Sequence, residues 1–310
     1  MDERIATRIR PTPLGHDEKI RISRALQVFA LDEIARQAPP RRDELVFHGG
    51  TGVSLVHGSP RWSEDLDFMA TPEAIGRLGE RHGAVERALR LKASVLTPGA
   101  RLDLQDKTGT VSRRHEHGEV ARWLIRWEHP AMLGAVRIKL EFYACPADRL
   151  GAYPSQAAWP AAREAQALHA LPAATLVSVF GDKIVAMASR DALKYRDLHD
   201  LGWLSPRLAA AGTTEEDRLE ALRASMGIYG KTPSDIAAGL ARPTVSEGIL
   251  DREAWEDDMR RWFAGPEYET LADRRELDRL HAAFRTEFAI GCDLVGRLCE
   301  AEVRAEGPEW

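Results

Sequence analysis

Residues 47–68 read FHGGTGVSLVHGSPRWSEDLDF, and the stretch ends in two acidic residues that alternate with apolar ones. This alternation predicts a half-buried strand in which Leu66 and Phe68 point into the core. Asp65 and Asp67 lie two apart, so their carboxylates leave the same face of that strand. Two neighbouring carboxylates repel each other unless a cation lies between them, and hard oxygen ligands favour Mg²⁺. The alternative interpretation is an exposed edge strand whose acidic side chains are simply solvated.

A glycine turn precedes the acidic strand. The apolar run Leu45–Phe47 predicts a strand that leads into Gly49 and Gly50, and Thr51 predicts the cap of a short helix to about residue 57. Glycines let backbone N–H groups approach an anion closely, and the start of a helix adds positive partial charge. The order of strand, turn, helix and acidic strand therefore predicts a phosphate-binding turn beside a metal site.

A second strand supplies a third carboxylate. Residues 135–143 alternate between apolar and polar side chains, which places Glu141 on the face that the apolar residues do not occupy. A carboxylate there, next to Asp65 and Asp67, would complete a two-metal arrangement for phosphoryl transfer. The alternative is a surface glutamate that pairs with Lys139.

The remaining predicted elements fall into two regions. Helices over 16–37 and 72–92 and strands over 101–105 and 120–127 accompany the two acidic strands. After residue 146 the strand patterns nearly vanish, and helices are predicted over 172–189, 191–204, 214–226, 232–241, 251–263 and 268–303. We expect an α+β fold, a mixed sheet with flanking helices in residues 1–150, followed by a mainly helical domain in residues 151–310.

Over residues 45–204 the chain resembles the AbiEii/AbiGii toxin family, nucleotidyltransferases of the DNA-polymerase-β-like superfamily. Four motifs carry the resemblance, in the family's order. The first comprises Gly49, Gly50, Thr51, Leu55, Arg61, Ser63, Asp65, Leu66, Asp67 and Phe68, with Gly52 where alanine is usual. The second is Lys139 with Glu141, the third is Lys183 in a predicted helix, and the fourth is RDLHDL at residues 196–201.

The resemblance also implies roles for these residues. It implies that Asp65, Asp67, Glu141 and Asp200 are catalytic, that the first three are metal ligands, and that Asp200 acts as general base. It implies nucleotide binding by Gly49, Gly50, Thr51, Arg61, Ser63, Lys139 and Lys183. Lys183 is expected at the β- and γ-phosphates, because a lysine neutralises phosphate as a flexible point charge. Asp197, three residues before Asp200 on the same predicted helix, is interpreted as an ion-pair partner.

The function implied by the resemblance is that of the toxin of a type IV toxin–antitoxin pair. Such an enzyme uses Mg²⁺, with Mn²⁺ as an alternative, to move NMP from an NTP to an RNA hydroxyl at a tRNA 3′ end. A protein hydroxyl is another implied acceptor, and an AbiEi-like antitoxin is the implied partner. Two alternatives stay open: a nucleotide-binding regulator without turnover, and a small-molecule nucleotidyltransferase of the antibiotic-modifying type.

Charge and composition bear on the partners of the protein and on its location in the cell. The 310 residues carry a net charge of −5, so no basic field covers the whole chain. Residues 1–42 are net positive and residues 247–310 are net negative. The acidic segment is expected to face away from RNA or toward a basic antitoxin. The arginines of the first segment are expected to contact RNA phosphates; they are Arg4, Arg8, Arg10, Arg21 and Arg24. Three cysteines without a disulfide framework, and the lack of a long apolar stretch, predict a cytoplasmic protein without a membrane span.

Other polar motifs are interpreted as structural. The tripeptide His115-Glu116-His117 lacks a third metal ligand at usable spacing, and His48 is expected to pack beside the site rather than to react. Cys292 and Cys299 lie seven apart on a predicted helix and are expected to face the core. Core or interface packing is expected for Trp123, Trp127, Trp255 and Trp262.

Overall fold

The computed structural model describes residues 10–108, 120–242, 245 and 252–306. Its centre is a seven-stranded sheet with the order β4-β5-β7-β3-β2-β11-β8. The pairs β3/β7 and β2/β11 are parallel and the other pairs are antiparallel, so the sheet is mixed. The strands are β2 (Leu45–His48), β3 (Leu66–Ala70), β4 (Arg101–Asp106), β5 (Val120–Glu128), β7 (Ala135–Ala144), β8 (Ser155–Ala158) and β11 (Leu171–Ala174).

One face of the sheet packs against two long helices, α1 (His16–Gln37) and α3 (Pro72–Leu96). The strands alternate as their sequences predict: Phe47, Phe68 and Phe142 are fully buried in the core shared with these helices. Thr71 begins α3, because its side chain accepts a hydrogen bond from the Ala74 N–H at 3.2 Å. Two short ladders, β1 (Thr12–Pro13) with β6 (Met132–Leu133) and β9 (Ala161–Ala162) with β10 (Ala165–Gln166), lie outside the main sheet.

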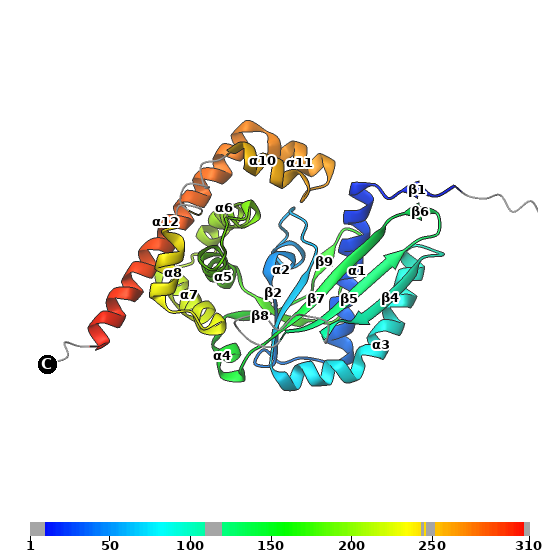
Figure 1. Ribbon diagram of the computed structural model, residues 1–310, viewed down its shortest axis with the longest axis horizontal. Coiled ribbons are helices and arrows are strands. Elements are labelled where there is room, and N and C mark those ends of the chain that lie inside the picture. The colour runs from blue at the N-terminus through cyan, green and yellow to red at the C-terminus, as the bar shows by residue number, and fades with distance from the viewer. Residues whose placement is uncertain (1–9, 109–119, 243–244, 246–251, 307–310) are drawn as a thin grey trace, which may run out of the picture.

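The other face of the sheet meets a helical region, on the left in Figure 1. Val46 and Met69 point to this side, where they join a second core that contains most of the apolar residues of the helices. The helices are α2 (Gly49–Leu55), α4 (Ala147–Ala152), α5 (Leu176–Ser189), α6 (Tyr195–Ala210), α7 (Glu215–Tyr229), α8 (Pro233–Leu240), α10 (Arg252–Arg260), α11 (Gly265–Ala272) and α12 (Arg274–Glu306). The predicted α+β class, with a mixed sheet, flanking helices and a helical C-terminal region, is confirmed.

The sheet extends further along the chain than the strand patterns predict. Strands β8 and β11 follow residue 150 and form one edge of the main sheet, with Ala173 of β11 opposite Phe47 of β2. The helix expected from residue 172 therefore begins at Leu176, where Thr175 caps it. Both strands are too short and too rich in alanine to show a clear alternation. The division of the chain into two domains stays a prediction.

Several smaller expectations are settled by burial. The four tryptophans predicted in the core or at an interface are all buried, and Cys292 and Cys299 are partly buried against the helical core. All three cysteines are free. Within the described residues, no helix is both long and apolar enough to cross a membrane. The tripeptide at residues 115–117 lies outside the described residues, as do Arg4 and Arg8.

Candidate active site

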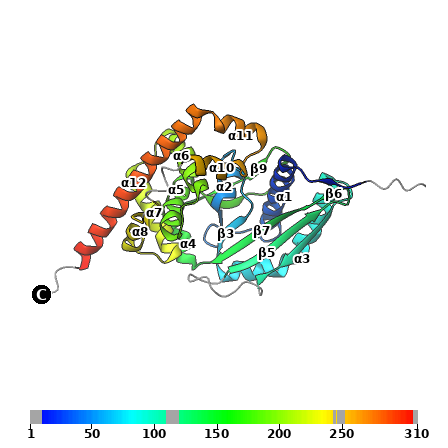
Figure 2. The same ribbon diagram turned by 45° about the horizontal axis from the view of Figure 1, so that its top comes forward.

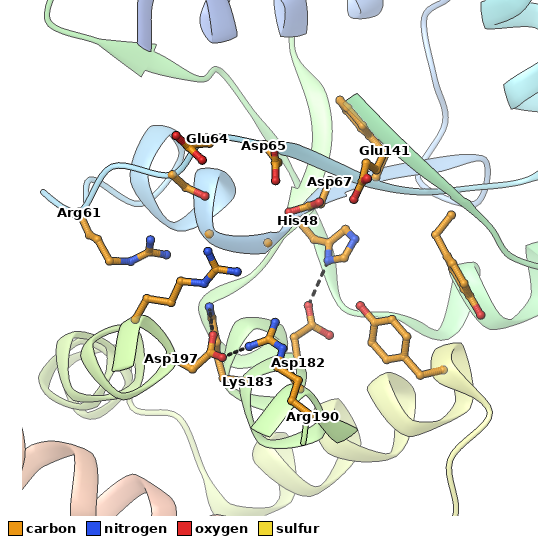
Figure 3. Close-up of a pocket in the computed structure, with 18 of the residues that line it drawn as sticks. His48, Arg61, Glu64, Asp65, Asp67, Glu141, Asp182, Lys183, Arg190 and Asp197 are labelled. Carbon is orange, nitrogen blue, oxygen red and sulfur yellow. Dashed lines mark hydrogen bonds and ion pairs between the residues drawn. The ribbon is translucent and has the colours of Figure 1, made fainter. Parts of the chain in front are cut away.

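A cavity of about 390 Å³ lies between the second face of the sheet and helices α5, α6 and α7. Figure 3 shows Asp65, Asp67 and Glu141 on its sheet side and Lys183, Arg190 and Asp197 on its helix side. The structure brings eight of the eleven predicted site residues to the cavity wall: Gly49, Gly50, Arg61, Ser63, Asp65, Asp67, Glu141 and Lys183. It does not place Thr51, Lys139 or Asp200 on that wall.

The three carboxylates lie side by side because of strand register. Asp67 of β3 is directly opposite Glu141 of β7, and Asp65 comes immediately before β3. Burial raises the pKa of both aspartates. The charge of Glu141 raises it further in each case, against a lowering by His48 at Asp67 and by Lys139 at Asp65. The acidic wall therefore carries repulsion that a bound cation would relieve.

The donor chemistry of this wall fits a divalent metal ion. Two aspartates and a glutamate offer only hard oxygen ligands, which Mg²⁺ prefers. The raised pKa values of Asp65 and Asp67 indicate that the protein leaves the charge of these two carboxylates poorly compensated. Among the described residues no three acidic, histidine or cysteine side chains already form a metal-binding group. Instead Glu141 pairs with Arg122, and Lys139 Nζ lies 3.4 Å from Asp65 Oδ2.

The two glycines leave room for the charged groups of the site. Gly49 has a φ of 74°, in the left-handed region, and a Cβ at this position would overlap the carboxylate of Asp67. A Cβ on Gly50 would lie 2.5 Å from a guanidinium nitrogen of Arg61 and 3.0 Å from Ser63 Oγ. Side chains at these positions would therefore fill the space in which Asp67, Arg61 and Ser63 face the cavity.

Helix α1 holds the loop that leads to the acidic strand. Gln27 donates hydrogen bonds to the backbone carbonyls of Ser63 and Glu64, at 2.8 and 3.1 Å. Arg24 donates to the carbonyl of Pro60, and the hydroxyl of Thr51 donates to that of Asp65. Thr51 thus holds the backbone of Asp65 instead of facing the cavity. Arg24 already has partners within the protein.

The C-terminal region fastens the same loop from the other side. The backbone N–H of Trp62 donates to the carbonyl of Trp262 at 2.7 Å. Asp17 of α1 accepts from the N–H of Gly265, and Arg24 lies 3.4 Å from a carboxylate oxygen of Glu267. Figure 2 shows the resulting contact between α11 and the N-terminal end of α1. The loop over residues 60–65, which we call the acidic loop, is thus held between α1 and residues 262–267.

A buried network of alternating charges forms the base of the cavity. Arg61 donates two hydrogen bonds to the carboxylate of Asp200, at 2.7 and 2.8 Å. Lys183 Nζ lies 2.5 Å from Asp200 and 2.8 Å from Asp197, which also pairs with Arg190. Asp197 is therefore an ion-pair partner, as its position in the sequence predicts.

This network bears on the expectation that Asp200 is a general base. Its side chain has no exposed surface, and although burial alone would raise its pKa, Arg61 and Lys183 hold it well below the ordinary value. A carboxylate bound by two cations and so reluctant to take a proton is a poor base. The geometry assigns Asp200 the task of orienting Arg61 and Lys183. Burial lowers the pKa of Lys183 to about 8, against the opposing effect of Asp200.

Further residues of the cavity carry no clear sequence signal. His48 Nδ1 lies 3.5 Å from Asp182, whose carboxylate also accepts hydrogen bonds from Tyr153 at 2.7 Å and Ser225 at 2.8 Å. His48 therefore packs between Asp182 and Asp67, in keeping with the packed position expected for it. Tyr229, from the end of α7, also lines the cavity and does not belong to any of the four motifs.

A site in which acidic oxygen ligands face cationic groups across a cleft is suited to phosphoryl transfer from an NTP. A family model described as "Nucleotidyl transferase AbiEii toxin, Type IV TA system" matches residues 33–284. The chain accordingly belongs to the AbiEii family of nucleotidyltransferase toxins from type IV toxin–antitoxin systems.

Solved structures of similar proteins cover nearly the whole chain at low identity. MenT4, a nucleotidyltransferase toxin from Mycobacterium tuberculosis H37Rv, is 20% identical with a TM-score of 0.46, over 92% of this chain and 94% of that one. JHP933 from Helicobacter pylori is 17% identical with a TM-score of 0.40, over 92% and 95% of the two chains. No curated protein matches the chain.

Proposed function

We propose that this enzyme transfers NMP from an NTP to a hydroxyl of RNA, at the 3′ end of a tRNA, in the cytoplasm. One observation carries the proposal: an acidic wall from the sheet faces a cationic wall from the helices across a single cavity. The acceptor oxygen would form a bond to the α-phosphorus, the bond to the leaving pyrophosphate would break, and the hydroxyl proton would pass to solvent. An AbiEi-like antitoxin is the partner we expect to restrain this activity.

Each wall has a separate part in the proposal. Asp65 and Asp67, with Glu141 beside them, would hold Mg²⁺, or Mn²⁺ in its place; when bound, the ion polarises the phosphates and steadies the leaving group. Lys183 and Arg61, oriented by Asp200, would neutralise the triphosphate. Gly49, Gly50 and Ser63 would border the nucleotide, while Thr51 and Lys139 would act through Asp65.

The decisive experiment offers the full chain each of four labelled NTPs with Mg²⁺ and total tRNA. We expect label at tRNA 3′ ends with one or more NTPs, none after chelation of the metal, and none with Asp67→Asn. NTP binding without any labelled acceptor would favour the regulator without turnover. Label on an aminoglycoside but not on tRNA would replace the RNA acceptor with a small molecule.

A further inference from the structure

A second cavity, of about 310 Å³, adjoins the active site at the start of α6. It is lined by Leu193, Lys194, Tyr195, Arg196, Asp258 and Arg261. Arg196 also lines the active-site cavity, so one guanidinium borders both spaces. We call this second cavity the basic side cavity. A polymer that enters the active site past Arg196 would lie against it.

The basic side cavity holds more positive charge than its own acidic residue balances. Three cations line it, and its one carboxylate, Asp258, pairs with Arg261. Within the described residues, the side chains of Lys194 and Arg196 form neither an ion pair nor a hydrogen bond. Partial burial lowers the pKa of both, and the nearby charge of Arg190 lowers that of Lys194 further. Cations kept together at this cost are suited to an anionic ligand.

The cations are also held in place before any ligand arrives. The guanidinium groups of Arg196 and Arg261 lie 5.3 and 5.0 Å from the ring centroid of Trp262, within cation–π distance. Trp262 itself is only 7% exposed, and its carbonyl accepts the hydrogen bond from Trp62 in the acidic loop. The position of the basic side cavity relative to the carboxylates is therefore fixed by direct contacts.

We propose that the basic side cavity binds backbone phosphate of the RNA acceptor, next to the nucleotide whose 3′ hydroxyl reacts. This inference rests on the proposed function, because that function requires the 3′ end of the RNA to lie in the active-site cavity. In the proposed function the NTP is bound by Lys183 and Arg61, which line the active-site cavity and not the basic side cavity. An acceptor strand brings regularly spaced phosphates that need partners outside the active-site cavity.

The test compares Lys194→Glu/Arg261→Glu with Arg223→Glu/Arg304→Glu. All four side chains are exposed, and Arg223 of α7 and Arg304 of α12 line a different cavity, so the second variant is a control with the same change in net charge. Binding of a labelled single-stranded RNA that ends in a tRNA 3′ sequence is followed by fluorescence anisotropy without NTP, and NTP affinity is measured by calorimetry.

We expect the Lys194→Glu/Arg261→Glu variant to bind the RNA about tenfold more weakly or worse, with a shallower salt dependence by about one unit of log–log slope. Its NTP affinity should match that of the control. Unchanged RNA affinity would overturn the inference, and so would an equal loss of NTP affinity, which would make the basic side cavity a triphosphate site.

Transfer assays separate this inference from the proposed function. If wild-type enzyme labels RNA and the Lys194→Glu/Arg261→Glu variant does so with the same KM for RNA, the inference is wrong and the function stands. If wild-type enzyme binds RNA through these residues but labels none, the inference stands as an RNA site and the proposed function is wrong.

Discussion

Asp67 has a partly buried carboxylate whose charged form lowers the stability of the fold. Burial and the adjacent charges of Asp65 and Glu141 raise its pKa in the folded state. Between the ordinary aspartate pKa and this raised value the folded protein binds more protons than the unfolded chain. Stability contributed by this group is therefore present at low pH and lost as pH rises, so that at neutral pH the charge opposes folding.

Replacing Asp67 with Asn should consequently raise the urea midpoint of unfolding at pH 7 while abolishing nucleotidyl transfer. The gain should shrink as the pH is lowered toward the ordinary pKa of aspartate. The control is Asp106→Asn: Asp106 lies on the far edge strand, and its hydrogen bonds with Thr108 lower its pKa despite partial burial, so this change should lower the midpoint. A fall in the midpoint with Asp67→Asn, or retained transfer, would contradict the assignment.

Lys183 forms ion pairs with two buried carboxylates and is also proposed to bind the triphosphate. Its replacement should therefore affect both stability and ligand binding, which are measured separately. Lys183→Ala leaves Asp197 with Arg190, and Asp200 with Arg61 and His199, and should cost about 3–5 kcal/mol of unfolding free energy in urea titrations. In calorimetry, NTP should lose more affinity than NMP, because we assign the lysine to the β- and γ-phosphates. Lys139→Ala, at the exposed pair with Asp65, should cost less than about 1 kcal/mol. Equal losses for NTP and NMP would place Lys183 away from the β- and γ-phosphates.

For single residues, the sequence predicts correctly which side chains face the cavity when their positions follow from local periodicity. Asp67 and Glu141 face the cavity because each alternates with buried apolar residues on its own strand. The bonds from Arg61 to Asp200 join residues 139 apart, and no local pattern reveals that Asp200 is already occupied. The same limit hides the contact of His48 with Asp182 and the presence of Tyr229 at the cavity.

Among elements, helix α6 carries Asp197 and Asp200 and depends on close packing against α12. A Cβ on Gly202 of α6 would overlap the carbonyl oxygen of Leu280 and lie 3.0 Å from its Cγ. The two helices therefore approach as closely as glycine allows, and a methyl group would push α6 away from α12. The charged network of the site would move with it.

Gly202→Ala should for this reason lower the unfolding free energy by about 1–3 kcal/mol and reduce transfer. The matched control is Gly227→Ala in α7, where a Cβ would meet nothing within 4 Å. That change should raise stability by up to about 1 kcal/mol, since alanine favours helix more than glycine does. Urea titrations measure both, and a neutral Gly202→Ala would show that α6 has room to adjust.

The helices and long strands follow from their sequences, whereas β8 and β11 do not. The long elements have either a 3.6-residue apolar period or strict alternation, and threonine caps mark the starts of α3, α5, α7 and α8. Strand β11 joins the sheet by pairing with β2 and β8, which are distant or equally short. Its conformation is set by those partners, so its own four residues carry too little information.

At the scale of the whole molecule, the salt dependence of transfer distinguishes an RNA acceptor from a protein or small-molecule acceptor. The chain is net negative, so RNA has to be drawn to local cations such as Arg10 and those of the basic side cavity. Transfer to tRNA should fall steeply between about 50 and about 200 mM salt, because phosphate contacts release counterions. Transfer kinetics measured across this range, for wild type and Arg10→Glu, check the prediction. A reaction insensitive to both salt and charge reversal would exclude tRNA as the acceptor.

The hydrogen bond from Trp62 to Trp262 also sets the order in which parts of the site can be assembled during synthesis. The ribosome makes the acidic loop early, but the residue that fastens it emerges 200 positions later. At about 5–20 residues per second, a nascent chain exposes the carboxylates for ~10–40 s before their enclosure can close. A chain halted in that interval contains the acidic residues but lacks Trp262, which fastens their loop. The loop beside the carboxylates is therefore fastened only after the rest of the cavity wall, whose last residue in the sequence is Tyr229, has been made.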